Sequence, residues 1–152
     1  MDHDTKGRIL ALDLGKRRIG LALSDELGLT AQGLETMERA GMRVDLARLS
    51  ELASECGVAL VLVGNPLHMD GSEGSQSAWA RDFAERLRGL TGLAVRMWDE
   101  RLTTVEAERV LRQSGISQQK RSAAVDRLAA VVLLQSYLDS VAVARGLGDE
   151  EG

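Results

Sequence analysis

The chain has 152 residues, of which 44% are hydrophobic and 28% charged, so it can bury the core of one globular domain and is too apolar for a disordered chain. Its formal net charge of −4 argues against a protein that coats nucleic acid nonspecifically, although local basic clusters are compatible with that total. The single cysteine, Cys56, excludes a disulfide framework, and with only two histidines a structural zinc site is not expected.

The ends of the chain carry no sign of a membrane or export segment. The N-terminal residues Met-Asp-His-Asp-Thr-Lys-Gly are polar, and no uncharged apolar run is long enough to span a bilayer. We therefore expect a cytoplasmic protein with no membrane partner, which also suits its single cysteine. We expect one domain over residues 1–145 and a flexible acidic tail over residues 146–152.

The first predicted element is a β-hairpin over residues 8–25. Two short apolar runs, 9–12 and 19–23, flank a turn that contains glycine. Asp13 ends the first run, and the turn continues with Gly15, Lys16, Arg17 and Arg18. A carboxylate beside a basic turn suits a metal ion and a phosphate backbone better than it suits a protein core.

The next segments predict a strand, a helix and a second buried strand. Residues 30–39 alternate loosely and predict a third, edge-like strand, whereas residues 43–56 have apolar positions at helical spacing and end at Gly57. Residues 58–63 are a continuous apolar run bounded by glycines. Such a run is typical of a strand that is buried on both faces and pairs in parallel.

The second half of the chain alternates between predicted helices and one more strand. A long loop over 64–75 contains the only proline and precedes a helix over 75–90, a strand over 93–98 and a helix over 105–113. The last helix, over 122–144, is apolar almost all round, so we expect it to pack deeply against the sheet. This order predicts a mixed α/β fold, in which an antiparallel start is followed by right-handed crossovers.

Three acidic residues occupy positions where a charge is costly. Asp13 ends a central apolar strand, Glu100 directly follows the last strand, and Asp126 lies within the final, mostly apolar helix. Ala123, Ala129 and Ala130 share the face of Asp126 and would leave room for a carboxylate that reaches toward the sheet. Such charges need a partner, a proton or a metal.

Each carboxylate taken alone also has an ordinary explanation. Asp13 could form the hairpin turn, and Glu100 could pair with a neighbouring arginine on a solvated loop. Asp126 could form a salt bridge with Arg121 or Arg127 at an exposed helix end. A carboxylate cluster at one end of the sheet explains all three positions together.

A carboxylate cluster favours hard divalent cations such as Mg²⁺ or Mn²⁺, which take oxygen ligands. Three carboxylates repel one another unless a cation offsets their charge, and a pair of such ions can activate water for phosphodiester hydrolysis. Basic residues on either side would hold the phosphates without reading sequence. We assign this nucleic-acid-binding role to Gly15, Lys16, Arg17, Arg18, Arg101, Lys120 and Arg121.

Four blocks of the chain resemble the YqgF/RuvX family of Holliday junction resolvases. Ile-Leu-Ala-Leu-Asp-Leu-Gly-Lys-Arg-Arg-Ile-Gly-Leu-Ala-Leu-Ser-Asp at 9–25 looks like the family's opening. Val-Gly-Asn-Pro-Leu-His-Met-Asp-Gly-Ser-Glu-Gly at 63–74 resembles its middle loop, and Asp-Glu-Arg-Leu-Thr-Thr at 99–104 its third block. Val-Asp-Arg-Leu-Ala-Ala-Val-Val-Leu-Leu-Gln-Ser-Tyr-Leu-Asp at 125–139 resembles its last.

The resemblance implies an RNase H-like fold, with a mixed five-stranded sheet whose first three strands are antiparallel. It implies that Asp13, Glu100 and Asp126 are the catalytic, metal-binding triad of a nuclease. The implied substrate is either branched DNA in recombination and repair or the 5′ end of pre-16S ribosomal RNA. Two residues, Asn65 and His68, depart from the family pattern, and His68 is either a catalytic acid or base or a plain loop residue.

Two other classes remain open at this point. The chain could be a noncatalytic nucleic-acid adaptor, or a phosphotransferase domain, since its hairpin resembles the phosphate-binding opening of the actin and sugar-kinase fold. Trp79, Phe83 and Tyr137 fall on helix faces typical of core, so recognition of backbone and shape is favoured over base stacking. A resolvase that cuts two strands symmetrically would call for a homodimer.

Overall fold

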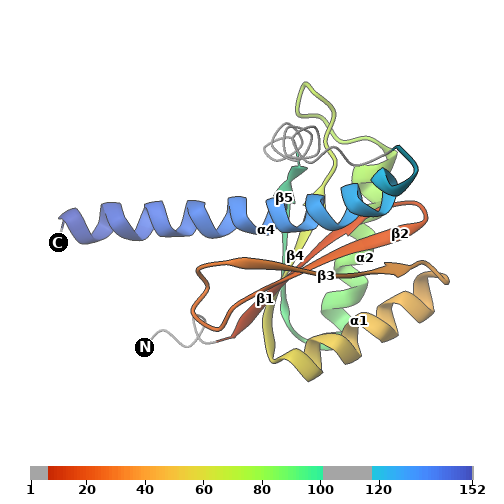
Figure 1. Cartoon of the computed structure of the whole chain (residues 1–152), viewed down its shortest axis with the longest axis horizontal. Helices are drawn as coiled ribbons and strands as arrows, with labels where there is room; N and C mark the ends of the chain where they lie inside the picture. Colours follow the sequence, from red (N-terminus) through yellow and green to blue (C-terminus); the bar gives the residue numbers. More distant parts are fainter. Residues whose placement is uncertain (1–6, 101–117, 152) are drawn as a thin grey trace.

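The computed structural model describes residues 7–100 and a helix at 118–151, in which the side chains at 118–126, 143 and 145–151 are not described. The described elements follow one another along the chain as strands and helices of a mixed fold (Figure 1). In chain order they are β1 Arg8–Leu14, β2 Arg18–Ser24, β3 Ala31–Glu38, α1 Met42–Cys56, β4 Val58–Asn65, α2 Ser75–Thr91, β5 Ala94–Asp99 and α4 Gln118–Glu151.

The strands form one five-stranded sheet in the order β3-β2-β1-β4-β5. The first three strands pair antiparallel, whereas β4 pairs in parallel with both β1 and β5. This arrangement confirms the predicted hairpin, the third edge strand and the parallel pairing of the apolar run that became β4. The predicted mixed sheet is therefore confirmed in both its antiparallel and its parallel part.

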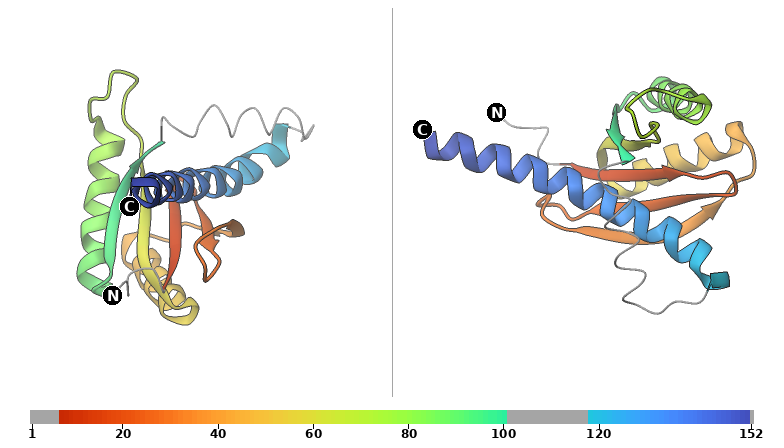
Figure 2. Two further views of the ribbon diagram at one scale, coloured as in Figure 1. Left: turned by 90° about the vertical axis from the view of Figure 1, so that its left-hand side faces the viewer. Right: turned by 90° about the horizontal axis from the view of Figure 1, so that it is seen from above.

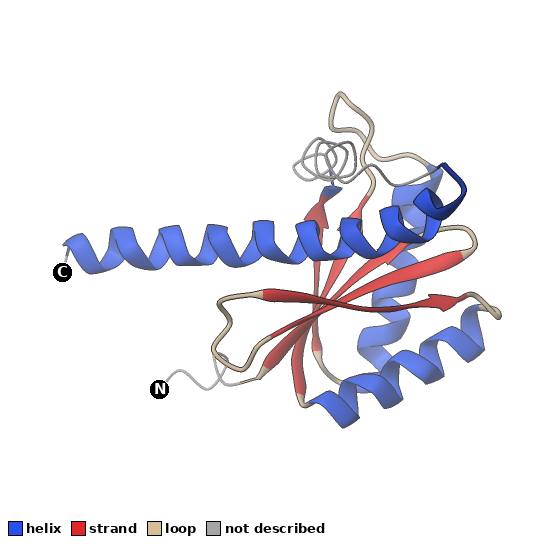
Figure 3. Cartoon of the chain, viewed as in Figure 1, coloured by secondary structure: helices blue, strands red, loops and turns tan. Residues whose placement is uncertain are grey.

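The helices cover opposite faces of the sheet, with α1 and α2 on one side and α4 on the other (Figures 2 and 3). Alternation along β1 separates the two cores: Leu10 and Leu12 belong to the α1 and α2 side, and Ala11 belongs to the α4 side. Ala11 and Ala130 are both fully buried in the α4 core, where small side chains let the helix approach the strands closely.

The helix α4 packs against β1, β2 and β3, as predicted, but it is not buried all round. Leu133 and Leu134 are buried, whereas Arg127, Asp139 and Ser140 are exposed. The sequence pattern overestimated the burial of α4 because, among the described elements, the helix packs mainly on one face of the sheet and its opposite face is exposed. No helix in the described part of the chain is long and apolar enough to cross a membrane.

The bounds of α4 extend beyond the predicted ones. The helix begins at Gln118 and continues to Glu151, whereas the sequence predicted bounds near 122 and 144. Once a helix is nucleated, each added residue contributes a hydrogen bond, which favours continuation through the glycines of the predicted tail. The flexibility of residues 146–152 stays a prediction, and the predicted helix at 105–113 lies outside the described residues.

Asn65, one of the two departures from the family pattern, joins the end of β4 to the first turn of α2. The hydroxyl of Ser77 donates a hydrogen bond to Asn65 Oδ1 at 2.6 Å. Ser77 is fully buried, so this bond satisfies a hydroxyl that water does not reach. A polar contact thereby ties the end of β4 to the start of α2, on either side of the loop between them.

Asn65→Ala should therefore lower the free energy of unfolding by about 1–3 kcal/mol, because it leaves the buried Ser77 hydroxyl without its acceptor. The same substitution made in a Ser77→Ala background should cost much less, since no hydroxyl is then left unpaired. Urea denaturation of the four proteins measures this coupling. Additive single effects would show that the hydrogen bond does not stabilise the loop.

Candidate active site

The parallel pairing of β1 with β4 brings the predicted carboxylates to one edge of the sheet. Leu12 pairs with Val63, so Asp13 and Gly64 are the next residues on their two strands. On the other side of β4, Gly64 pairs with Trp98 in β5, and Glu100 follows that strand directly. Asp13 and Glu100 therefore approach each other from the two strands that flank β4.

Gly64 is the residue that permits this approach. A Cβ atom at this position would lie 2.9 Å from both Cγ and Oε2 of Glu100, closer than real Cβ contacts. The Glu100 carboxyl thus lies directly over the Gly64 backbone, in space that any other residue would fill. In the sequence, this glycine marks only the end of an apolar run. Its place immediately after a buried strand was the available signal.

The two carboxyls are coupled. Burial raises the pKa of the Glu100 carboxyl from its usual 4.5 to about 8, and the charge of Asp13, a hydrogen bond with Asp13 and the charge of Asp99 act in the same direction. The protonated Glu100 carboxyl donates this bond to Asp13. Arg96, an arginine four residues before Glu100, donates to the Tyr137 hydroxyl at 3.1 Å. At neutral pH the pair therefore keeps one proton between two acids.

The third predicted acid, Asp126, belongs to α4. Ala130 packs beside Ala11 near the middle of β1, and Tyr137 lies with Ile9 near the start of that strand. Position 126 is one helical turn before Ala130 and on the same face, in the direction that leads toward the Asp13 end of β1. Its side chain is outside the described residues.

The structure does not describe the side chains of the predicted basic residues that follow Glu100 in the chain. Lys120 and Arg121 lie in the first turn of α4 with side chains that are not described, and Arg101 is outside the described residues. Within 7–100 and the described part of α4, no three His, Cys, Asp or Glu side chains gather closely enough to hold a metal ion. The described site is thus a pair of acids, Asp13 and Glu100.

The turn between β1 and β2 carries the predicted basic cluster. The Gly15 N–H donates to the Arg18 carbonyl at 2.9 Å, and a Cβ on Gly15 would lie 2.7 Å from that oxygen. Glycine is therefore required by the turn itself. Lys16 and Arg17 are exposed, whereas Arg18 forms an ion pair with Glu38 at 3.0 Å. Lys16 and Arg17 are the cations of this turn that are most accessible to a phosphate.

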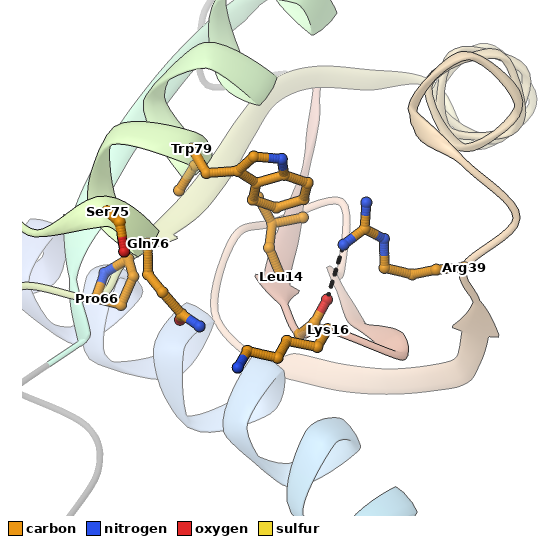
Figure 4. Close-up of a pocket in the computed structure, with 9 residues that line it drawn as sticks. Leu14, Lys16, Arg39, Pro66, Ser75, Gln76 and Trp79 are labelled. Atoms are coloured by element: carbon orange, nitrogen blue, oxygen red, sulfur yellow. Dashed lines mark hydrogen bonds between the residues drawn. The ribbon is translucent and has the colours of Figure 1, made fainter.

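A cavity of about 290 Å³ opens on the other side of this turn (Figure 4). Its lining includes Lys16, Trp79 and Arg39, a residue that the sequence analysis did not select. Phe83 and Tyr137 are buried as predicted, but Trp79 is only half-buried and faces this cavity. Trp79 packs against the same core beside Phe83, with 5.5 Å between the ring centroids, so its predicted place on a core-facing side of α2 is confirmed in part and the rest of its ring lines the cavity.

His68 lies on the exposed loop between β4 and α2. Its imidazole rests on Gly74, in the space a side chain there would fill. Its backbone N–H donates to the Ser72 carbonyl at 2.9 Å, and its carbonyl accepts from Gly71 at 2.8 Å. These contacts give His68 a part in holding the loop together.

Residues 7–140 match the profile of a family described as RuvX, Holliday junction resolvase. A relative from Koribacter versatilis is 51% identical over 145 residues, which cover 95% of this chain and 92% of the relative. A relative from Symbiobacterium thermophilum is 50% identical over 133 residues, which cover 88% of this chain and 92% of the relative. Both relatives are named provisionally as pre-16S rRNA nucleases.

Two solved resolvases share the fold. RuvC of T. thermophilus, in complex with a Holliday junction substrate, matches with a TM-score of 0.57 and 17% identity over 90% of this chain and 96% of that one. The Fowlpox virus resolvase, in complex with its Holliday junction DNA, matches with a TM-score of 0.54 and 14% identity over 88% of this chain and 98% of that one. The fold is RNase H-like, as the resemblance implied.

The raised pKa of Glu100 predicts how the stability of the metal-free protein depends on pH. Between pH 4.5 and about 8 the folded state keeps a proton that the unfolded chain releases. The contribution of this group to stability is therefore complete below pH 4.5 and is lost as the pH rises through 8. Glu100→Gln, which cannot ionise, should raise the free energy of unfolding at pH 8 by about 1–3 kcal/mol.

Denaturation of metal-free protein between pH 5 and 9 tests this expectation. Glu51→Gln, on the exposed side of α1, is the matched control and should keep the pH dependence of the wild type. If Glu100→Gln also keeps that dependence, the carboxyl pair does not hold a shared proton.

Gly64→Ala should displace the Glu100 carboxyl from Asp13, since the new methyl group would occupy its place. We expect a loss of about 1–3 kcal/mol in stability and a lower pKa for Glu100 in a carboxyl titration followed by NMR. Gly89→Ala, at a glycine of α2 with open space around its Cβ position, is the control and should stabilise the helix slightly. An unchanged Glu100 titration in Gly64→Ala would contradict the positioning role of this glycine.

Proposed function

This chain belongs to the RuvX family, and we propose that it is a divalent-metal-dependent endonuclease that hydrolyses phosphodiester bonds in structured nucleic acid. The observation that carries the proposal is the Asp13–Glu100 pair, held across Gly64 at the edge of the sheet. Two neighbouring acids that are largely shielded from water lower the stability of the folded protein, so stability alone does not explain their presence. Such perturbed carboxyls are typical of functional sites.

The donor set fits a hard divalent ion. Asp13 and Glu100 offer carboxylate oxygens. Burial is the main cause of the raised Glu100 pKa, and the repulsion from Asp13 that adds to it is one that a cation would offset. We propose Asp126 as the third ligand, because its position on α4 leads toward the same edge of β1. A bound Mg²⁺ or Mn²⁺ would supply an activated water and stabilise the leaving oxygen.

The chain's own residues would position the substrate around these acids. Lys16 and Arg17 stand exposed at the turn that follows Asp13, where they can neutralise phosphates on one side of the cleaved bond. We assign the same role on the other side to Arg101, which follows Glu100, and to Lys120 and Arg121 at the start of α4. Such contacts hold the backbone without reading base sequence.

Precursor ribosomal RNA and four-way junction DNA are both substrates to test. The relatives near 50% identity are named for pre-16S rRNA, which favours processing of its 5′ end in the cytoplasm. The family description names the Holliday junction, whose symmetric cleavage would require a homodimer. A side-by-side assay of both substrates under the same metal conditions therefore decides between them.

Asp13→Asn should lower cleavage of the preferred substrate by at least about 100-fold, because it removes one proposed ligand while leaving the size of the side chain unchanged. The assay uses wild type and variant with Mg²⁺ and with Mn²⁺ on both substrates. Asp82→Asn, an exposed acid on α2 that pairs with Arg86, is the control and should cleave like the wild type.

Equal cleavage by wild type and Asp13→Asn would exclude this site as the catalytic centre. Binding without any cleavage, unaffected by Asp13→Asn but weakened by substitutions of Lys16 and Arg17, would identify a nucleic-acid adaptor. Saturable binding of ATP in a calorimetric titration would identify the phosphotransferase class instead.

A further inference from the structure

The cavity beside the hairpin turn lies at the same edge of the sheet as the acids but on its opposite face. Leu14, the residue after Asp13, packs with the α1 and α2 core and lines the cavity, whereas the α4 face carries Ala11, two residues before Asp13. Side chains alternate along a strand, so Asp13 and Leu14 point to opposite faces. The turn at Gly15 and Lys16 is the rim that separates the acid pair from the cavity.

The walls of the cavity are of two chemical kinds (Figure 4). Leu14, Pro66 and Trp79 offer apolar surfaces, and that of Trp79 is a flat aromatic ring. Lys16 and Gln76 stand at the rim and are exposed, so the first offers a cation and the second an amide with both a donor and an acceptor. A planar, partly apolar group attached to a phosphate matches this combination.

Arg39 makes the cavity rigid. Its Nε donates to the fully buried carboxylate of Asp45 at 3.3 Å, and its Nη1 donates to the Gly15 carbonyl at 3.3 Å. Its guanidinium lies over the Trp79 ring, 4.4 Å from the ring centroid. One residue thus fixes both the hairpin turn and the aromatic wall, so the cavity is formed before any ligand arrives.

We propose that this cavity is a subsite for one unstacked nucleotide of the substrate strand, with its base in the cavity and its phosphate against Lys16. The inference rests on the proposed nuclease function. It adds that the protein recognises one base of the substrate strand beside the cleaved bond. Asp13 and Gly15 are two residues apart, at most about 7 Å, so a base in the cavity and a phosphate at the acids would belong to neighbouring nucleotides.

The size and chemistry favour a single nucleotide over larger or simpler ligands. A volume near 290 Å³ is at the small end of ligand pockets, so it has room for one nucleotide and none for a duplex. A lone phosphate would make no contact with the apolar walls, and an apolar ligand would make no use of the exposed Lys16 ammonium at the rim. Unstacked bases are typically held by aromatic or arginine surfaces and by hydrogen bonds to their edges.

Tryptophan fluorescence tests occupancy of the cavity directly. Trp98→Phe leaves Trp79 as the only tryptophan in the chain, and circular dichroism checks that this variant is folded. Short single-stranded DNA and RNA oligomers are titrated in EDTA, so that binding is measured without cleavage. We expect a saturable change in Trp79 emission with the intact strand of at least one of the two nucleic acids.

A strand with one abasic site supplies the decisive comparison. When the missing base is the one that enters the cavity, we expect affinity to fall by about 5- to 150-fold, the range of a single base–aromatic contact. Gln76→Ala should weaken binding of the intact strand and leave binding of that abasic strand unchanged. Gln32→Ala is the matched control, since this exposed glutamine lies at the far end of the hairpin sheet, where β3 pairs with Leu23.

The proposal is overturned by no change in Trp79 emission, by equal affinity for intact strands and for strands with an abasic site at every position, or by an equal effect of Gln76→Ala on both kinds of strand. Tight binding of a free mononucleotide, with no preference for the strand, would also overturn it and would identify an effector site. The nuclease proposal is judged separately by the cleavage assay with Asp13→Asn. Cleavage without binding in the cavity would refute the subsite alone. Binding in the cavity without cleavage would refute the nuclease function alone.

Discussion

The close approach of two carboxyls over one glycine is the constraint on which the site depends. The parallel register of β1, β4 and β5 brings Asp13 and Glu100 to the two sides of β4, and only a residue without a side chain at position 64 lets them meet. The raised pKa of Glu100 follows from this geometry, because burial and a neighbouring acid both disfavour its charge. The fold therefore maintains an unfavourable charge arrangement, and a divalent cation is what would relieve it.

Most of the fold could be predicted from the sequence, because its signals are local and agree with one another. Two apolar runs around a glycine-containing turn predicted β1 and β2, and an apolar run bounded by glycines predicted β4. Helical spacing predicted α1 and α2 within a few residues. The partial exposure of α4 could not be predicted, since its pattern shows what can be buried and does not show how much surface the sheet offers. The predicted ends of α4 were too close together. A helix that has formed can continue through residues with low helix propensity, such as glycine, because each further turn adds hydrogen bonds.

The candidate site was predicted less completely, because its geometry depends on contacts between distant residues. Asp13 and Glu100 were selected for their places at strand ends, and the structure brings them together. Gly64 and Arg39 were not predicted as site residues. A glycine after an apolar run usually indicates the end of a strand, and an arginine at the end of an edge strand is usually exposed to solvent. Their roles appear only once the strands are paired and Arg39 meets Asp45, a fully buried residue in the first turn of α1.

The hairpin turn connects the two faces of this sheet edge, and that connection limits which substrates fit. A backbone phosphate bound at the acids, as we propose, would lie on the α4 face, whereas the cavity lined by Leu14 and Trp79 opens on the α1 and α2 face. A regular duplex cannot reach both places at once, because its bases are stacked inside and its backbone curves smoothly. A strand that bends over the Gly15–Lys16 turn can do so if one of its bases leaves the stack. Unstacking a base costs the least free energy in a junction or in an irregular region of folded RNA. The shape of this edge therefore favours such substrates over a regular double helix.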